Sequence, residues 1–271
     1  MYIVRPDGKD LRRLTDLDGT EREPRLSLTA SAVVYRRDVD GNDELFRVNL
    51  EGREPVQLTD SPSRDAHPSW SPDGKRIVFT TERWGEPELA LIDPDGNDLV
   101  RLTWDQSVNR YPAWSPRGDW IAFVSYRDSN ANLYLIRPDA SELRRLTDEG
   151  ISDTTPAWSP DGARLVYQVE TGPKKFPALA IQELESGAVQ RLPDFLVRPR
   201  YPTFSPDGTE LLFSAGEQGE RQLVVYSLED QQARALEWGR LPPYESDWSN
   251  YPLPWELEEP FDPRAILRPG S

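Results

Sequence analysis

The chain has no cysteine, and it has only one histidine and one methionine among its 271 residues. Without cysteine it can form no disulfide and no thiolate metal site, and it has no cysteine nucleophile. The single histidine, His67, cannot by itself build a metal centre that needs several imidazole ligands. Because cysteine-free proteins work in oxidising and in reducing compartments, this absence does not indicate a location.

Positively charged residues are fewer than negatively charged ones. The 32 Lys and Arg residues are outnumbered by 47 Asp and Glu residues, so the formal net charge is -15. A protein of this sign repels a phosphate backbone and cannot gain much from the release of its counterions. We therefore expect no nucleic-acid partner.

Long apolar runs are missing too. No segment approaches the roughly 18 apolar residues that a membrane span requires, and residues 1–16 lack the basic start and apolar run of a signal peptide. These observations predict no membrane span and a cytoplasmic location. The alternative is a periplasmic or secreted protein whose leader has been removed. Nothing in the sequence specifies an oligomeric state.

The dominant feature that is present is an internal repeat. Four segments that resemble Pro-x-Trp-Ser-Pro-Asp-Gly begin at Pro68, Pro112, Pro156 and Pro202. With two degenerate copies, the serine of this motif recurs at Ser27, Ser71, Ser115, Ser159, Ser205 and Ser249. The leucine of a Leu-Thr element recurs with the same steps, at Leu14, Leu58, Leu102, Leu146, Leu192 and Leu236. Two independent positions thus indicate six units.

Each unit predicts four strands, because its apolar residues alternate with period two. The first strand carries the Trp-Ser-Pro element and ends in an Asp-Gly turn. The second contains an apolar pair such as Ile77 and Phe79, and the fourth bears Leu-Thr. In the sixth unit the second strand falls on residues 253–258 and the third on residues 1–4, at opposite ends of the chain.

This arrangement predicts an all-β fold, a six-bladed β-propeller of four-stranded antiparallel blades. N-terminal strands would form the outer pair of the last blade and C-terminal strands its inner pair, because an open array would leave unpaired sheet edges. The expected blades cover residues 17–60, 61–104, 105–148, 149–194, 195–238 and 239–259 with 1–16. Residues 260–271 follow as a C-terminal tail.

The succession of Trp-Ser-Pro-Asp-Gly, an apolar strand, Leu-Tyr-x-Ile and Arg-Arg-Leu-Thr resembles the repeat of TolB-type propellers. The resemblance covers nearly the whole chain and implies a scaffold that binds a peptide or protein. Propellers of this type also gate serine peptidases and occur in lyases. However, the chain contains no Gly-x-Ser-x-Gly elbow, which a serine peptidase of this kind would need. The propeller lyases resemble metal enzymes with several histidine ligands, whereas this chain has His67 as its only histidine. We therefore expect no catalytic residue, metal or cofactor.

The candidate binding site is the channel mouth, where the residue before each first-strand proline and the residue preceding it should form a ring. Tyrosine and arginine are common in protein contacts, so this ring predicts docking of a peptide or protein. Its candidate members are Arg22, Glu23, His67, Arg110, Tyr111, Thr155, Arg200, Tyr201, Tyr244 and Glu245. Two alternatives remain: a hydrolase or lyase using Glu23, His67 and Glu245 around a cation or as acid and base, and an accessory subunit for a separate catalytic chain.

A second candidate surface lies on the rim loops. A two-residue insertion places Lys174, Lys175 and Phe176 in one loop, and Trp84 lies in the corresponding loop of an earlier blade. Together they could form a lateral docking site. Alternatively, the lysines keep the loop solvated and Trp84 packs on its own blade. The acidic loop 38–44 is interpreted as a hairpin turn, since a calcium loop would need glutamate where Asn49 stands.

Two repeated features receive structural interpretations. The tryptophans Trp70, Trp114 and Trp158 recur at one register of the first strand, which indicates packing between adjacent sheets in preference to carbohydrate binding. The aspartates of Ser-Pro-Asp-Gly lie on different blades and cannot converge on one substrate. We therefore expect them to accept hydrogen bonds within their turns.

Overall fold

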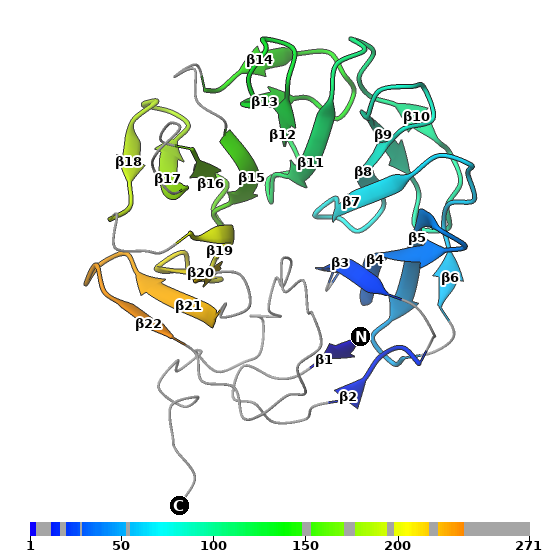
Figure 1. Cartoon of the computed structure of the whole chain (residues 1–271), viewed down its shortest axis with the longest axis horizontal. Helices are drawn as coiled ribbons and strands as arrows, with labels where there is room; N and C mark the ends of the chain where they lie inside the picture. Colours follow the sequence, from blue (N-terminus) through cyan, green and yellow to red (C-terminus); the bar gives the residue numbers. More distant parts are fainter. Residues whose placement is uncertain are drawn as a thin grey trace, which may run out of the picture.

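The computed structural model describes residues 1–3, 12–16, 20–27, 29–52, 55–147, 153–170, 177–193, 198–216 and 222–235. In this part of the chain the sheets stand as blades around a common centre (Figure 1). Each blade is four-stranded and antiparallel, and its strands are adjacent in chain order. This confirms an all-β propeller with four-stranded blades. The described residues include no helix of the length and hydropathy needed to cross a membrane.

Five four-stranded blades lie within the described residues. The first contains β3 (Glu21–Ser27), β4 (Ala32–Val39), β5 (Asn42–Asn49) and β6 (Val56–Gln57). The second contains β7 (Asp65–Trp70), β8 (Ile77–Thr81), β9 (Glu88–Ile92) and β10 (Val100–Arg101). The third contains β11 (Asn109–Trp114), β12 (Ile121–Ser125), β13 (Asn132–Ile136) and β14 (Leu143–Arg145). The fourth contains β15 (Asp153–Trp158), β16 (Arg164–Val169), β17 (Ala178–Glu183) and β18 (Val189–Arg191). The fifth contains β19 (Arg200–Phe204), β20 (Glu210–Ala215), β21 (Gln222–Ser227) and β22 (Ala233–Ala235).

At the N-terminal end, β1 (Tyr2–Ile3) pairs antiparallel with β2 (Arg12–Arg13) as a separate two-stranded sheet. These two strands occupy the segments expected for the outer pair of a sixth blade. The expected inner pair, in residues 239–259, and the tail 260–271 lie outside the described residues. The number of six blades, the blade limits and the closure by both chain ends therefore stay predictions.

The core lies between consecutive blades. One buried cluster joins Ala32, Val34 and Leu45 of the first blade to Ile77 and Phe79 of the second. The tryptophan of the first strand completes such contacts: Trp70 Nε1 donates to Arg25 O at 3.0 Å and Trp158 Nε1 donates to Ala113 O at 2.9 Å. The donor of each bond lies one blade after its acceptor, so these rings pack between sheets as predicted.

The Ser-Pro-Asp-Gly turns have the same internal bonding wherever Asp is present. In the second blade, Ser71 Oγ donates to Asp73 at 2.6 Å and accepts from Arg76 N at 2.9 Å. Asp73 also accepts from Lys75 N at 3.1 Å, and the Ser71 hydrogen bond helps to hold the pKa of this carboxyl below its usual value. The aspartate is therefore a turn acceptor, as expected.

The threonine of the Leu-Thr repeat has a structural role. Thr59 Oγ1 accepts a hydrogen bond from Leu45 N at 2.9 Å, and Thr103 accepts from Leu89 N at 2.9 Å. The same hydroxyl of Thr59 donates to the buried carboxylate of Glu44 at 2.5 Å. The threonine thus ties the short outer strand to the buried third strand of its blade.

The rim loops behave as ordinary hairpin connections where they are described. Val39 pairs with Asn42, and the two residues between them have positive φ values, 54° for Asp40 and 88° for Gly41. This is the backbone of a tight hairpin turn, so the turn interpretation of the acidic loop holds. Trp84 is half-buried against the cluster between the first two blades, with the Arg101 guanidinium 4.6 Å from its ring centre.

Candidate functional site

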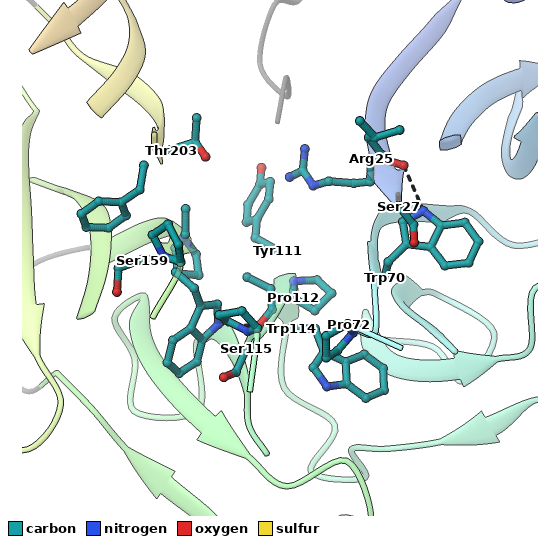
Figure 2. Close-up of a pocket in the computed structure, with 18 of the residues that line it drawn as sticks. Arg25, Ser27, Trp70, Pro72, Tyr111, Pro112, Trp114, Ser115, Ser159 and Thr203 are labelled. Atoms are coloured by element: carbon teal, nitrogen blue, oxygen red, sulfur yellow. Dashed lines mark hydrogen bonds between the residues drawn. The ribbon is translucent and has the colours of Figure 1, made fainter. Parts of the chain in front are cut away.

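The innermost strands β3, β7, β11, β15 and β19 surround a cavity of about 470 Å³ at the centre of the ring (Figure 2). The cavity is lined from the residues before the first-strand prolines down to the Ser-Pro turns. His67, Tyr111, Thr155 and Tyr201 form part of its wall. Four of the predicted mouth residues therefore meet at one cavity.

Each of the five innermost strands that the structure describes is interrupted by a bulge at the predicted mouth position. The pairing of β7 with β8 shifts between Ala66 and Ser69, and the other four blades show the same shift. The residue before each proline has a left-handed backbone, with φ of 54° at Glu23, 53° at His67, 55° at Tyr111, 52° at Thr155 and 54° at Tyr201. A bulge re-aims a side chain and removes its neighbour from the ladder. This explains why a proline, which cannot donate, is accepted inside each strand.

The left-handed conformation is costly for these residue types. Each non-glycine residue held in this region costs on the order of 1–3 kcal/mol, and a β-branched residue such as Thr155 is a clear outlier there. Such strain persists only where the surrounding structure enforces it, and it is typical of binding and catalytic sites. Non-glycine residues with positive φ also occur in turns and loops elsewhere, such as Asp40 and Ala140, but this register is the one place where they recur inside a strand of all five described blades.

Both carboxylate oxygens of Glu23 contact other groups of the protein. Its side chain is 9 % exposed, its Oε2 accepts from His67 N at 2.7 Å and its Oε1 lies 3.3 Å from Arg36 Nη2. Arg36 in turn pairs with Asp43 at 2.5 Å. Glu23 therefore joins the bulges of the first two blades and satisfies a backbone N–H that the second bulge leaves outside its own ladder.

The His67 imidazole is 11 % exposed, and its Nε2 lies 3.6 Å from Glu23 Oε1. Burial lowers its pKa to about 4, although the nearby Glu23 carboxylate opposes the shift. Its ring lies against Tyr111 with ring centres 4.1 Å apart, and its Nδ1 lies 3.4 Å from Thr80 Oγ1. Burial also raises the pKa of Tyr111. At neutral pH this pair offers the channel an uncharged aromatic surface with polar edges.

The remaining mouth residues lie farther out or beyond the described residues. Arg110 is half-exposed and lies 3.7 Å from Glu82, whereas Arg22 and Arg200 are exposed. Tyr244 and Glu245 fall outside the residues that the structure describes, as do Lys174, Lys175 and Phe176 of the rim. Within the described ranges, no three His, Asp or Glu side chains are grouped as metal ligands would be.

Sequence reasoning missed Arg25. It follows Pro24 on β3, lines the cavity, and is the only charged side chain among the described lining residues, since His67 is neutral. The repeat nevertheless marks Arg25 as an exception. The same register carries small uncharged residues in the next four units, at Ser69, Ala113, Ala157 and Thr203.

The sequence matches the family described as TolB beta propeller domain over residues 1–172. No curated protein sequence matches the chain. Among solved structures, TolB from Acinetobacter baumannii is 21% identical with a TM-score of 0.74, covering 86% of this chain and 61% of its own. The chain thus spans about three fifths of the length of that structure.

Two further solved structures show the range of proteins with this fold. An oligogalacturonate lyase in complex with manganese is 16% identical with a TM-score of 0.67, covering 97% of this chain and 74% of its own. A puromycin-hydrolyzing peptidase from Mycobacterium tuberculosis is 15% identical with a TM-score of 0.67, covering 86% of this chain and 40% of its own. At these identities the similarity shows the fold alone.

Proposed function

The chain belongs to the TolB β-propeller family, and on that premise we propose that it is a non-enzymatic scaffold that binds a peptide or protein segment at its channel mouth and rim loops. The observation that carries this proposal is the row of left-handed bulges. They hold His67, Tyr111, Thr155 and Tyr201 around one cavity at a cost in backbone strain.

The chemistry of the cavity wall suits an extended segment. Tyr111 and Tyr201 supply aromatic area with a polar edge, the kind of residue that dominates contact energy. A volume of about 470 Å³ lies in the range of small-ligand pockets and is too small for a folded domain. We therefore expect a few residues of a partner to enter the channel while the rest of it contacts the mouth and the rim.

A metal-assisted lyase or hydrolase is the first alternative, since one structure with this fold is a lyase with manganese. The described candidate residues do not fit such a centre. His67 is the only histidine, and both oxygens of Glu23 are engaged by Arg36 and the His67 backbone. We derive no catalytic step from these residues.

An accessory role for a separate catalytic chain is the second alternative. It is favoured by one observation, that the chain corresponds to 40% of the length of a peptidase with a similar propeller. A stable complex with a hydrolase, recovered after co-expression with neighbouring genes, would support this alternative.

The proposal is tested by selecting linear peptides from a random library on the immobilised protein and measuring their affinity by calorimetry. Replacing Tyr111 or Tyr201 with alanine should weaken selected peptides about tenfold or more, because a central aromatic anchor is lost. Leu143→Ala is the matched control, since Leu143 is an exposed apolar residue on the outer strand β14. Equal affinities of the wild type, the two tyrosine variants and the Leu143→Ala control would reject the channel mouth as the binding surface.

A further inference from the structure

We propose that the channel contains a carboxylate-binding site centred on Arg25. The inference deepens the proposed function, on which it rests, because it names the chemical group that enters the channel. Arg25 lies on β3, its side chain is half-buried, and Figure 2 shows its guanidinium pointing into the cavity toward the side where Tyr111 stands.

Arg25 forms no ion pair with a described Asp or Glu; the Glu23 carboxylate acts on it only at longer range and is engaged by Arg36 and the His67 backbone. Within the described part of the chain its one side-chain hydrogen bond runs from Nη1 to Pro24 O at 3.3 Å, so most of its five N–H groups have no protein partner there. Two other half-buried arginines do form ion pairs: Arg101 pairs with Glu88 at 3.1 Å, and Arg47 pairs with Asp95 at 3.1 Å. Buried charges are normally paired, so an unpaired guanidinium in a cavity indicates a missing anion.

The environment agrees with this conclusion. Burial lowers the pKa of Arg25 to about 10, against the opposing effect of Glu23. The side chain therefore stays protonated at neutral pH while it lacks both full hydration and a partner.

The geometry favours a carboxylate over a phosphate. A planar guanidinium binds a carboxylate through two parallel hydrogen bonds, whereas a phosphate dianion would enter a protein of net charge -15 with one cation to meet it. Pro112, Ala113, Pro156 and Ala157 line the same cavity, so the body of the ligand should be compact and apolar. The carboxylate belongs either to a peptide, at its chain end or on an acidic side chain, or to a free small acid.

One residue of the chain itself could take the place of an external carboxylate. Asp247 occupies the Arg25 register in the sixth sequence unit, outside the described residues. An ion pair between the two would supply the missing anion internally. Asp247→Asn separates this arrangement from an external ligand.

The experiment titrates two matched pairs of probes into the full-length protein and follows binding by NMR. One pair is N-acetylalanine and its amide, and the other is the N-acetylated peptide Ala-Pro-Ala with a free or an amidated C-terminus. We expect each free acid to bind and each amide to bind about tenfold or more weakly, since a charge-assisted bidentate contact is lost. Arg25→Gln should remove this preference, Arg25→Lys should retain part of it, and the control Arg47→Gln should leave it unchanged.

Three results would overturn the inference: equal binding of acid and amide, a preference that survives Arg25→Gln, or binding only in the Asp247→Asn protein. Binding of N-acetylalanine alone identifies a free acid as the source, and stronger binding of the tripeptide identifies a peptide. The two proposals fail separately. Selected peptides that bind with amidated ends and tolerate Arg25→Gln would keep the scaffold function and reject the carboxylate site. Arg25-dependent binding of free acids with no peptide selected would do the reverse.

Discussion

Arg25 has a measurable consequence for the ligand-free protein. Arg25→Met should raise the free energy of unfolding by about 1 kcal/mol, because it replaces an unpaired, partly desolvated charge with an apolar side chain of similar length. For a chain of this size that corresponds to roughly 2–4 °C in Tm. The Trp70 hydrogen bond to the Arg25 backbone does not depend on the side chain. Differential scanning calorimetry measures the change.

Arg47→Met is the control, because Arg47 is paired with Asp95 and should not gain stability on substitution. A lower Tm for Arg25→Met would mean that the guanidinium is satisfied in the free protein.

His67 should make stability depend on pH between about 6.5 and 4. Its folded pKa is about 4, below the ordinary value of 6.5, so in this range the unfolded chain binds a proton that the folded protein does not. Stability is therefore complete above pH 6.5 and falls as the pH drops, by up to about 3 kcal/mol. Urea unfolding of the wild type and of His67→Gln over this range isolates the effect.

Subtracting the stability of His67→Gln from that of the wild type at each pH removes the contribution of the other titrating groups. Asp73 and Asp161 have lowered pKa values and Glu44 has a raised one, but all three are present in both proteins. A difference in stability between the two proteins that does not change with pH would show that the imidazole is not protected from protonation.

At the scale of the strand, the bulges are the feature with the clearest energetic signature. Thr155 has a φ of 52° and a β-branched side chain. Thr155→Gly should stabilise the protein by about 1 kcal/mol, since glycine takes this conformation without steric cost. Thr154→Gly, one residue earlier in the regular part of β15, should destabilise it by a similar amount. The opposite signs are read from denaturation midpoints at constant m-value.

If both glycine variants are destabilised equally, the bulge carries no strain at this register, and the argument from strain to binding fails with it. The same variants extend the peptide test. Thr155→Gly removes a side chain from the cavity lining and should weaken ligand binding even as it stabilises the fold.

For the whole molecule, we predict that the two chain ends pair and close the ring. The repeat register aligns Met1 with Leu133 and Trp255 with Ile121. Because Leu133 pairs with Val124 and Tyr134 with Phe123, the same pairing in the last blade would place Tyr2 opposite Leu257. Since the chain has no native cysteine, Tyr2→Cys with Leu257→Cys should form an intramolecular disulfide on oxidation, visible by non-reducing electrophoresis and mass spectrometry.

Leu143→Cys with Leu257→Cys provides the control, because Leu143 lies on the outer strand of the third blade. Disulfide-linked dimers, or free thiols in both double variants, would contradict closure by the two chain ends.

Much of the architecture could be read from the residues alone, because it is local and repeated. The Asp-Gly turns, the alternating second strand and the Leu-Thr clasp are made by residues close in sequence or by pairs that recur at constant spacing. The prediction that the tryptophans pack between blades is confirmed for the same reason: Trp70 and Trp158, two repeats apart, each donate to the backbone of the preceding blade, whereas the Trp114 indole donates to Gly118 O of its own turn.

The site depended on contacts that no repeat specifies. The left-handed backbone at Thr155 is a property of the bulge, and the residue type argues against it. Glu23 was expected to face the channel mouth as a candidate ligand, but its oxygens are occupied by Arg36 and by the backbone of His67 on the next blade. Arg25 could be picked out as an exception to its register, whereas its lack of a partner depends on which side chains of other strands reach the channel. Periodic residues encode the blades because each blade repeats the same local physics. The chemistry of the channel arises where different blades meet, and so it exists only in the assembled ring.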